Sequence, residues 1–229
     1  MVHFSDLDAG AAAEGEYKRH VERPPGLNGS YARYVKRSFD ILAVLLAAPF
    51  VLPVVLLLGL LIARDGGPAL YVQDRVGQGG RVFRIWKLRS MVVDAERRLE
   101  AHLAADPAAH AEWNSTQKLK RDPRITGFGR MIRKASLDEL PQLWNVLKGD
   151  MSLVGPRPMM PHQTALYPGR AYYALRPGLT GFWQISRRNE TSFAGRAAYD
   201  TAYASRISLL TDLLVLVATV RVVLRGTGY

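Results

Sequence analysis

The longest apolar stretch of the chain runs from Ile41 to Ala63 and holds no charged side chain over 23 residues. At a rise of about 1.5 Å per residue, a helix of this length covers the hydrocarbon core of a bilayer. The stretch begins too far from the N-terminus and runs too long for a cleavable signal peptide. The pattern therefore predicts a membrane helix rather than a buried helix of a soluble core.

Two prolines, Pro49 and Pro53, lie inside this stretch, and each of them removes a helix hydrogen bond. Basic residues flank both ends, with Lys36 and Arg37 before the stretch and Arg64 after it. The positive-inside rule fixes an orientation only where the flanks differ in charge. Both features favour a helix that enters one leaflet, breaks at the prolines and leaves on the same side. A spanning helix remains open on the sequence alone.

The apolar stretch divides the chain into three parts. Residues 1–30 are rich in Ala, Gly, Pro and mixed charge without apolar periodicity, which predicts a mobile arm. Residues 31–64 hold the membrane helix. Residues 65–229 are long enough for one compact domain, which we expect to be cytoplasmic.

The sequence predicts that the compact domain is mainly helical with one small β-hairpin. Residues 70–77 and 81–89 are rich in β-formers and flank a Gly-Gly pair, which predicts the hairpin. In the second run Lys87 and Arg89 alternate with Trp86 and Leu88, so one face is cationic and the other is apolar. These two cations either lie in solvent or face a phosphate.

Apolar spacing and turn residues predict the remaining elements. We expect helices over about 91–105 and 136–148, the second with Leu137, Leu140, Trp144 and Leu147 on one face. We expect loops over 106–124 and 149–161, and turns over 170–190. The apolar segment 207–224 is either a core helix or an amphipathic helix at the membrane interface, and periodicity alone does not decide between them.

Charge and composition narrow the classes of partner. The formal net charge is +11, and residues 1–63 are neutral, so residues 64–229 carry the whole excess. A basic domain implies an anionic partner such as nucleic acid, anionic lipid or phosphorylated small molecules. The chain has no cysteine and its five histidines are scattered, which excludes a thiolate site and argues against zinc. Between Trp113 and Lys134, seven Lys/Arg accompany the single acid Asp122, as in a solvated or lipid-facing surface.

Two adjacent carboxylates, Asp138 and Glu139, follow this basic run. In the simplest interpretation Ser136 and Glu139 form a capping box and Asp138 complements the helix dipole. Capping and catalysis need not exclude each other, because a helix N-terminus also attracts phosphate. An ionised carboxylate beside Mg²⁺ and a phosphoanhydride can act as a nucleophile at phosphorus.

Two arginines near this pair have side chains suited to phosphoryl oxygens. Arg133 precedes Asp138 by five residues, and Arg157 lies in a rigid Gly-Pro-Arg-Pro loop. Their guanidinium groups can neutralise phosphoryl oxygens with two parallel hydrogen bonds. Phosphoryl transfer depends mainly on positioning and charge neutralisation, so the stretch from Ser136 to Pro158 predicts this chemistry.

The motifs resemble those of the bacterial sugar transferase family, also called monotopic phosphoglycosyl transferases. The resemblance covers roughly residues 33–229 in order and rests on one long signature and four shorter motifs. These are Lys36-Arg37-x-Phe39-Asp40, Lys87-x-Arg89-Ser90-Met91, Asp122-Pro-Arg-Ile-Thr126, the signature Ser136–Pro158 and Arg176-Pro-Gly-Leu-Thr-Gly181. A signature of this length is far more specific than a lone short motif.

The resemblance implies transfer of a sugar-1-phosphate, here expected to be a hexose phosphate, from a UDP-sugar to undecaprenyl phosphate, with release of UMP. The family's two-step mechanism makes Asp138 the nucleophile, with Glu139 as its partner, and requires Mg²⁺, which Asp138 and Glu139 would hold. The family's helix is re-entrant and broken at a Ser-Pro pair, where this chain has Leu52-Pro53 and an additional Pro49. The cations expected to bind substrate are Lys87, Arg89, Arg133, Arg157 and Arg176.

These expectations place the protein at the cytoplasmic face of the bacterial inner membrane, starting exopolysaccharide or other glycoconjugate assembly. A homodimer is compatible with the sequence. The alternative is a non-catalytic, membrane-anchored basic scaffold that binds anionic lipid or an assembly partner, although it does not explain the carboxylate pair. Nucleic-acid binding ranks last, because the chain shows no known binding module and carries the long apolar stretch. The sequence does not identify the sugar.

Overall fold

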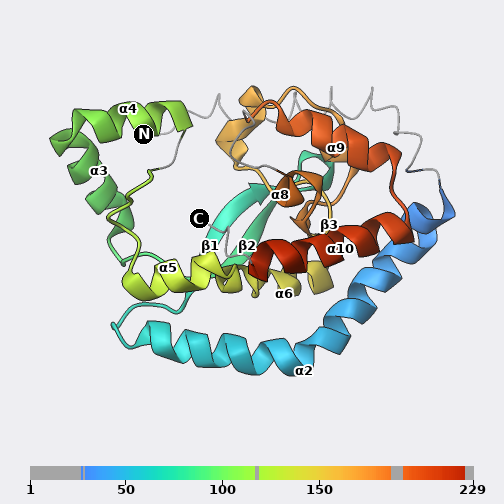
Figure 1. The fold of residues 1–229 in the computed structure, drawn as a ribbon, viewed down its shortest axis with the longest axis horizontal. Coiled ribbons are helices and arrows are strands. Elements are labelled where there is room, and N and C mark those ends of the chain that lie inside the picture. Colours follow the sequence, from blue (N-terminus) through green and yellow to red (C-terminus); the bar gives the residue numbers. More distant parts are fainter. Residues whose placement is uncertain (1–26, 28, 117–118, 187–192, 225–229) are drawn as a thin grey trace, which may run out of the picture. The chain divides into compact units, whose positions relative to one another are not determined.

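The structure is a computed structural model that describes residues 27, 29–116, 119–186 and 193–224. Its described part is mainly helical with two small two-stranded sheets, which confirms the predicted helical class and hairpin (Figure 1). The chain divides into two compact units. Unit 1 comprises Met1–Ala48, Val72–Ile85 and Gln142–Val222. Unit 2 comprises Pro49–Tyr71, Trp86–Pro141 and Val223–Tyr229.

Three elements run through both units. Helix α2 spans Lys36–Ala63, and strands β1 and β2 span Leu70–Val76 and Val82–Leu88. The two strands pair as one sheet and are joined by a tight turn that contains the 3₁₀ helix η3, Gln78–Gly80. The amide of Gly77 closes this turn on the carbonyl of Arg81 at 2.7 Å. The predicted hairpin is therefore confirmed.

Helix α2 is helical at every residue from Lys36 to Ala63, including both prolines. The predicted break at Pro49 and Pro53 is therefore not an interruption of the helix, although the chain passes from unit 1 to unit 2 between Ala48 and Pro49. Together with the π-helical turn η2, Tyr31–Val35, α2 is the one helix among the described residues that is long and apolar enough to cross a membrane. Only 11% of its apolar window is buried, which is consistent with membrane association.

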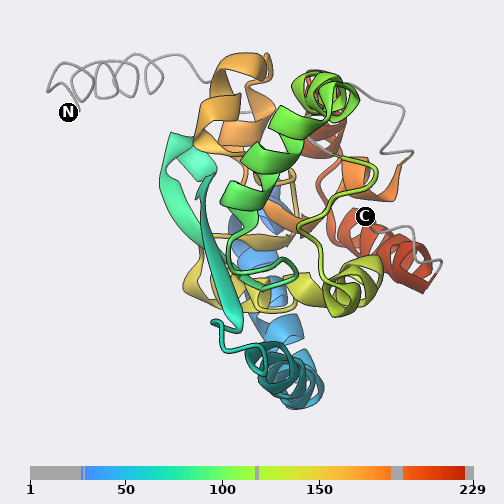
Figure 2. The same ribbon diagram turned by 90° about the vertical axis from the view of Figure 1, so that its left-hand side faces the viewer.

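Unit 2 holds most of the elements around the carboxylate pair. These are α3 (Ala95–Ala105), α4 (Pro107–Thr116), α5 (Gly127–Lys134) and η4 (Leu137–Glu139). Helices α3 and α4 diverge from Asp106 in clearly different directions (Figures 1 and 2). The core of the unit is small and combines the second half of α2, the end of β2 and α5. Its buried members are Leu58, Ile62, Leu88 and Ile132.

Three predictions for unit 2 need correction. The helix expected from Met91 begins at Ala95, because Met91 instead forms an antiparallel bridge with Ile125. The loop expected over 106–124 contains α4, whose first turn is capped by the Asp106 carboxylate at 2.9 Å from the amide of Ala108. The signal for this helix was Asp106-Pro107, a capping residue followed by proline at the first helical position.

The expected helix over 136–148 is two short helices, because the chain turns between η4 and α6 (Gln142–Lys148) at Pro141. The break changes the phase of the second piece, so Trp144 is 56% exposed and Asn145 and Val146 are fully buried. The predicted apolar face is therefore wrong at Trp144, whereas Leu147 packs against the core of unit 1 as predicted.

Unit 1 contains the remaining elements and the larger core. In chain order after α6 these are β3 (Ser152–Val154), η5 (Pro161–Leu166), α7 (Ala171–Ala174), β4 (Gly178–Thr180), α8 (Phe182–Ile185), α9 (Arg196–Ser205) and α10 (Leu209–Leu224). The segments expected to be loops and turns thus hold a parallel β3–β4 pair, in register from Ser152 with Gly178. The buried core comprises Val44, Phe83, Ile85, Val146, Met151, Leu153, Val154, Ala171, Leu175, Tyr203, Ala204, Ile207 and Val215.

The β3–β4 pair explains the glycines in two of the sequence motifs. A Cβ on Gly155, just after β3, would overlap with the carbonyl oxygen of Arg176. A Cβ on Gly178 would overlap with the amide of Gly155, and one on Gly181 with its carbonyl oxygen. Because the two backbones touch at these three positions, no residue with a side chain fits there without moving the strands.

Two buried aspartates tie the first half of α2 to the rest of unit 1. Asp212 of α10 is fully buried and accepts hydrogen bonds from Tyr31, Lys36 and Tyr203, each at 2.6 Å. Asp40 is 1% exposed and accepts from the Ser152 hydroxyl at 2.7 Å and from the Leu153 amide at 3.2 Å. Buried carboxylates need such partners, so these contacts fix α2 against β3 and α10.

Candidate active site

Unit 2 brings together four of the residues that the sequence singled out: Lys87, Arg133, Asp138 and Glu139. Lys87 lies on β2, Arg133 in the last turn of α5, and the two carboxylates on η4. Neighbouring apolar side chains fix these elements, because Leu88, Ile132 and Leu137 pack in the core of unit 2. Each of these core residues is next in sequence to a site residue: Leu88 to Lys87, Ile132 to Arg133 and Leu137 to Asp138.

Helix α5 is positioned at its first turn. The Thr126 side chain caps the helix and accepts a hydrogen bond from the Gly129 amide at 2.8 Å. A Cβ on Gly129 would overlap with the carbonyl of Ser90, so the helix lies directly on the backbone that follows β2. This close approach holds α5, and with it Arg133, beside the strand that carries Lys87.

The carboxylate pair sits on a single 3₁₀ turn rather than at the start of an α-helix. Ser136 adopts φ 55° and ψ 21°, the one positive φ of a non-glycine residue in the described chain, and its side chain caps nothing. The predicted capping box is therefore wrong, because Ser136 adopts a left-handed backbone and its side chain forms no cap hydrogen bond. Non-glycine residues in this conformation carry strain and occur often beside functional groups.

Glu139 forms an ion pair with Lys87, with 2.8 Å between Nζ and Oε1. Both side chains are 19% exposed, so the pair is partly withdrawn from water but still reachable. The two residues are 52 positions apart in the chain, and the pairing joins β2 to η4. The Lys87 ammonium, one of the two predicted to face either solvent or a phosphate, is thereby fixed at the carboxylate pair.

Asp138 is 7% exposed, and burial raises the pKa of its carboxyl above the ordinary value. Lys87 and Arg133 act in the opposite direction and lower this pKa, whereas the neighbouring charge of Glu139 raises it. Desolvation is the largest influence, so the backbone at this turn does not by itself hold Asp138 ionised, as the helix dipole was expected to do. Lys87, Arg133 and a backbone hydrogen bond to Asp138 all favour the ionised form of this buried carboxylate.

Arg89, predicted to bind substrate, has protein partners on all three of its guanidinium nitrogens. It donates to the carbonyls of Ile62, Pro68 and Met91, and to both carboxylate oxygens of Asp65. The side chain is 8% exposed and closes the segment between α2 and β1. These contacts favour a role in positioning this segment over direct contact with substrate.

Arg157 and Arg176 belong to unit 1 and not to the unit that carries the carboxylates. Arg157 lies over the ring of Trp183 at 5.9 Å. Arg176 donates from Nε to the carbonyl of Gly149 at 3.1 Å, and burial together with the charge of Arg37 lowers its pKa. Of the predicted substrate ligands, Lys87 and Arg133 thus belong to the same unit as the carboxylates, and Arg157 and Arg176 belong to unit 1.

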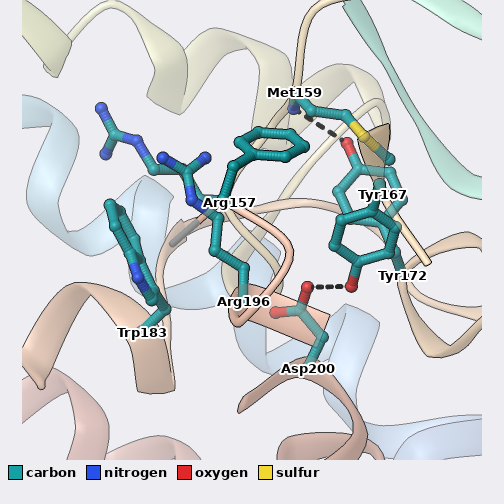
Figure 3. A pocket seen from close by; sticks show the side chains of 8 residues that line it. Arg157, Met159, Tyr167, Tyr172, Trp183, Arg196 and Asp200 are labelled. Atoms are coloured by element: carbon teal, nitrogen blue, oxygen red, sulfur yellow. Dashed lines mark hydrogen bonds between the residues drawn. The ribbon is translucent and has the colours of Figure 1, made fainter. Parts of the chain in front are cut away.

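The sequence did not predict that Arg157, Arg196 and Asp200 lie in one cluster in unit 1. Arg157, Trp183, Phe193, Arg196 and Asp200 line one small pocket there, together with Met159, Tyr167 and Tyr172 (Figure 3). The available signal was the spacing of Arg196 and Asp200, four residues apart on α9, which places both on one helix face.

The carboxylate pair fits Mg²⁺ only in combination with a phosphorylated ligand. Among the described residues, no group of three or more His, Cys, Asp or Glu side chains could hold a metal ion. Mg²⁺ is, however, commonly bound by one or two carboxylates together with water and substrate phosphates. Asp138 and Glu139 offer hard oxygen donors of this kind, so the donor set suits a Mg²⁺ ion that shares a diphosphate.

Comparison with known proteins identifies the class. The family model for bacterial sugar transferases matches residues 31–226, so the chain belongs to the bacterial sugar transferase family. It is 47% identical over 199 residues to the undecaprenyl-phosphate galactose phosphotransferase of Salmonella typhimurium, and 46% identical over 199 residues to the UDP-galactose-lipid carrier transferase of Erwinia amylovora. It is 45% identical over 196 residues to the exopolysaccharide production protein ExoY of Sinorhizobium fredii.

The relatives differ in length. The matches cover 86% of this chain but only 42% of the Salmonella and Erwinia proteins. The match to the Sinorhizobium protein covers 84% of this chain and 87% of that protein. The chain thus corresponds to less than half of the two longer relatives and to most of the shorter one.

Proposed function

We propose that this chain transfers a hexose-1-phosphate from a UDP-sugar to undecaprenyl phosphate through a covalent phosphosugar–Asp138 intermediate, and so starts exopolysaccharide or other glycoconjugate assembly. The observation that carries the proposal is the buried Asp138 carboxylate with Lys87 and Arg133 close enough to lower its pKa. The names of the Salmonella and Erwinia relatives, which mention undecaprenyl phosphate and UDP-galactose, support the acceptor and the donor.

In the first step, a carboxylate oxygen of Asp138 attacks the phosphorus that bears the sugar. The bond from this phosphorus to the bridging oxygen breaks, and UMP leaves with that oxygen and its electron pair. In the second step, a phosphate oxygen of undecaprenyl phosphate attacks the same phosphorus. The bond to Asp138 breaks, the carboxylate is restored, and an undecaprenyl diphosphate sugar is released. No proton, oxidant or further reactant is needed for this balance.

The neighbours of Asp138 have distinct parts in this scheme. Lys87 and Arg133 favour the ionised nucleophile and offer positive charge to phosphoryl oxygens. Glu139, held by Lys87, presents the second carboxylate. Mg²⁺ bound by Asp138 and Glu139 would neutralise charge on the diphosphate. Arg157 and Arg176 remain predicted substrate ligands, whereas Arg89 fits a positioning role.

The same proposal places the protein at the cytoplasmic face of the inner membrane, with α2 as a re-entrant helix. The support is the exposure of apolar side chains along α2. In its first half, Leu42, Leu45 and Leu46 are 60%, 53% and 75% exposed, and in its second half Phe50 and Leu60 are 78% and 71% exposed. Since large apolar side chains are seldom exposed in such number in water, a lipid environment accounts for them.

The test of the proposal is UMP release by purified protein with undecaprenyl phosphate and a panel of UDP-sugars that includes UDP-galactose, UDP-glucose and UDP-N-acetylgalactosamine. We expect release with at least one hexose donor and its loss in Asp138→Asn. Burial raises the pKa of Asp138, so a neutral amide is expected to preserve the fold. EDTA should stop turnover if Mg²⁺ takes part.

The matched control is Asp94→Asn, which changes an exposed carboxylate paired only with Arg97 on the surface of unit 2. It should release UMP at the rate of the natural protein. Full activity of Asp138→Asn would remove Asp138 as the nucleophile. No UMP release across the whole panel would favour the non-catalytic membrane scaffold instead.

A further inference from the structure

The pocket around Arg196 in unit 1 has an excess of hydrogen-bond donors. The Nε1–H of Trp183 and the Nε–H of Arg196 are buried and have no hydrogen-bond partner among the described residues. Trp183 is only 5% exposed, so its Nε1–H is shielded from bulk solvent. Neither group can accept a hydrogen bond, and a buried donor without an acceptor costs free energy. These two donors could therefore be satisfied by a ligand atom that accepts hydrogen bonds.

The acceptors of this pocket have hydrogen bonds to groups other than Trp183 and Arg196. The Asp200 carboxylate accepts a hydrogen bond from Tyr167, and the Tyr172 hydroxyl accepts from the Met159 amide at 3.2 Å and donates to the carbonyl of Val76. Figure 3 shows the arginines and Trp183 converging on one side of the pocket, with the two tyrosines on the other. None of these acceptors is hydrogen-bonded to Trp183 Nε1 or Arg196 Nε in the described structure.

The charge of the pocket points to an anion. Arg196 lies between two rings, 4.1 Å from the centroid of Trp183 and 4.6 Å from that of Phe193. Burial, and next the charge of Arg157, lower the pKa of Arg196 to about 10, so it stays protonated at neutral pH. The charged side chains that line the pocket are two arginines, Arg157 and Arg196, and one carboxylate, Asp200. Ring contacts satisfy the faces of a guanidinium but provide no acceptor for its N–H groups.

We infer that this pocket is a phosphoryl-binding site, in which Trp183 and Arg196 donate hydrogen bonds to one oxygen of a phosphate group and Arg157 balances its charge. The pocket encloses about 10 Å³, room for one water-sized group, so a single oxygen enters and the rest of the phosphate lies at the mouth. Phosphate fits because it is anionic and carries only acceptor oxygens at neutral pH. The site is separate in sequence from Asp138, and only the source of its phosphate rests on the proposed function.

The source of the phosphate is either the nucleotide or the lipid, and binding measurements distinguish the two. The full-length protein in detergent is titrated calorimetrically with UDP, UMP, uridine, inorganic phosphate and undecaprenyl phosphate. Trp183→Phe removes one N–H and keeps a ring for stacking. Arg196→Met keeps the length of the side chain and removes the charge. Arg206→Met, an exposed arginine just after α9, is the control.

We expect both variants to weaken binding of at least one phosphate ligand by about tenfold or more, since a hydrogen bond to a charged group is lost. Uridine should bind equally to all proteins, and Arg206→Met should stay within about twofold. A loss confined to UDP and UMP assigns the nucleotide, and a loss confined to undecaprenyl phosphate assigns the lipid. A loss for inorganic phosphate alone supports the site with a free anion as its ligand.

Three results would overturn the inference: unchanged affinity for every phosphate ligand in both variants, an equal loss for uridine, or no phosphate binding by the natural protein. Thermal unfolding of each variant verifies its fold, and Trp183→Phe is the conservative variant if Arg196→Met is unstable. UDP carries no sugar to transfer, so these titrations do not depend on turnover. Failure of the proposed function would appear instead as absent UMP release by the natural protein.

Discussion

At the scale of single residues, the chemistry depends on how Asp138 is kept both buried and reactive. A buried carboxylate favours its protonated form, whereas a nucleophile at phosphorus must be ionised. Lys87 and Arg133 offset the burial, and Glu139 opposes them. Because Lys87 also pairs with Glu139 at 2.8 Å, one ammonium serves both carboxylates. The protonation of Asp138 is therefore set by its burial, the largest influence, together with the charges of Lys87, Arg133 and Glu139.

This balance predicts the pH dependence of turnover. The raised pKa of Asp138 puts the acidic limb of kcat/KM above the pH at which an ordinary aspartate ionises, with activity lost as pH falls through that pKa. Lys87→Gln removes a charge that lowers the pKa and should move this limb to higher pH. Glu139→Gln removes a charge that raises the pKa and should move it to lower pH. Both variants should also be slower, Lys87→Gln by roughly a hundredfold.

The measurement is UMP release as a function of pH for each protein. The control is Arg97→Gln. The Arg97 side chain is 82% exposed, and its ionic partner is Asp94 rather than Asp138 or Glu139. This variant should leave the profile unchanged. Shifts of the same sign in Lys87→Gln and Glu139→Gln, or no shift in either, would contradict the assignment of these charges to Asp138.

At the scale of elements, the buried Asp212 joins three helical segments. It lies on α10 and accepts hydrogen bonds from η2, from the start of α2 and from α9, through Tyr31, Lys36 and Tyr203. Opposite this contact, α10 exposes Leu210, Leu214 and Val217, which are 66%, 61% and 65% exposed. The helix therefore has a polar anchor on its buried face and an apolar outer face, which favours the interfacial helix over the core helix, the two alternatives that periodicity left open.

Removing the anchor should destabilise unit 1 strongly. Asp212→Ala leaves Lys36, 11% exposed, without its ionic partner, and breaking one side of a buried pair typically costs about 3–5 kcal/mol. Asp94→Ala, which breaks the exposed pair with Arg97, should cost no more than about 1 kcal/mol. Chemical unfolding in detergent measures both. A loss for Asp212→Ala as small as that of the control would mean that the buried pair adds little to the fold.

The elements also show where local pattern is sufficient and where it is not. The hairpin and α10 follow directly from β-rich runs and apolar spacing. Helix α4 was hidden by low apolar periodicity, although Asp106-Pro107 marks its start. The pair β3–β4 could not be predicted, because strands of three residues carry almost no periodic signal and their pairing joins Ser152 to Gly178. Ser136 matched a capping pattern, but its backbone adopts a left-handed conformation that composition does not reveal.

At the scale of the whole molecule, α2 decides how the protein meets the membrane. The helix continues through Pro49 and Pro53, so a re-entrant path would need a bend within one helix rather than a break between two. The absence of cysteine makes this path testable with single introduced thiols. Two single variants, Lys18→Cys before the helix and Gln78→Cys after it, report on the two ends of α2 in intact cells.

If α2 is re-entrant, both thiols are cytoplasmic and neither should react with a membrane-impermeant reagent until the cells are opened. If α2 spans the membrane, the residue at position 18 should react in intact cells while the one at position 78 stays protected. Lysed cells provide the control for reactivity at each position. Labelling of position 18 alone would therefore contradict the re-entrant proposal.

Family membership and the reaction class were within reach of the sequence, because the signature around Asp138 is long and specific. The site itself was only partly predictable. Lys87 and Arg133 were named, but the pairing of Lys87 with Glu139 depends on contacts across 52 residues. Arg89 was predicted to bind substrate, and its hydrogen bonds to Asp65 and three carbonyls favour a positioning role that the sequence did not indicate. Trp183 and Arg196 became recognisable only through their unpartnered donors.

The central claim is that Asp138 carries the phosphosugar, and the most direct test is to detect that adduct. The purified protein is incubated with a UDP-sugar that supports UMP release, in the absence of undecaprenyl phosphate, and is quenched and examined by mass spectrometry. The account predicts an added sugar-phosphate mass on the peptide that contains Asp138, its absence in Asp138→Asn, and its loss when undecaprenyl phosphate is added. An adduct on another residue, or sustained lipid-linked turnover in Asp138→Asn, would contradict the account.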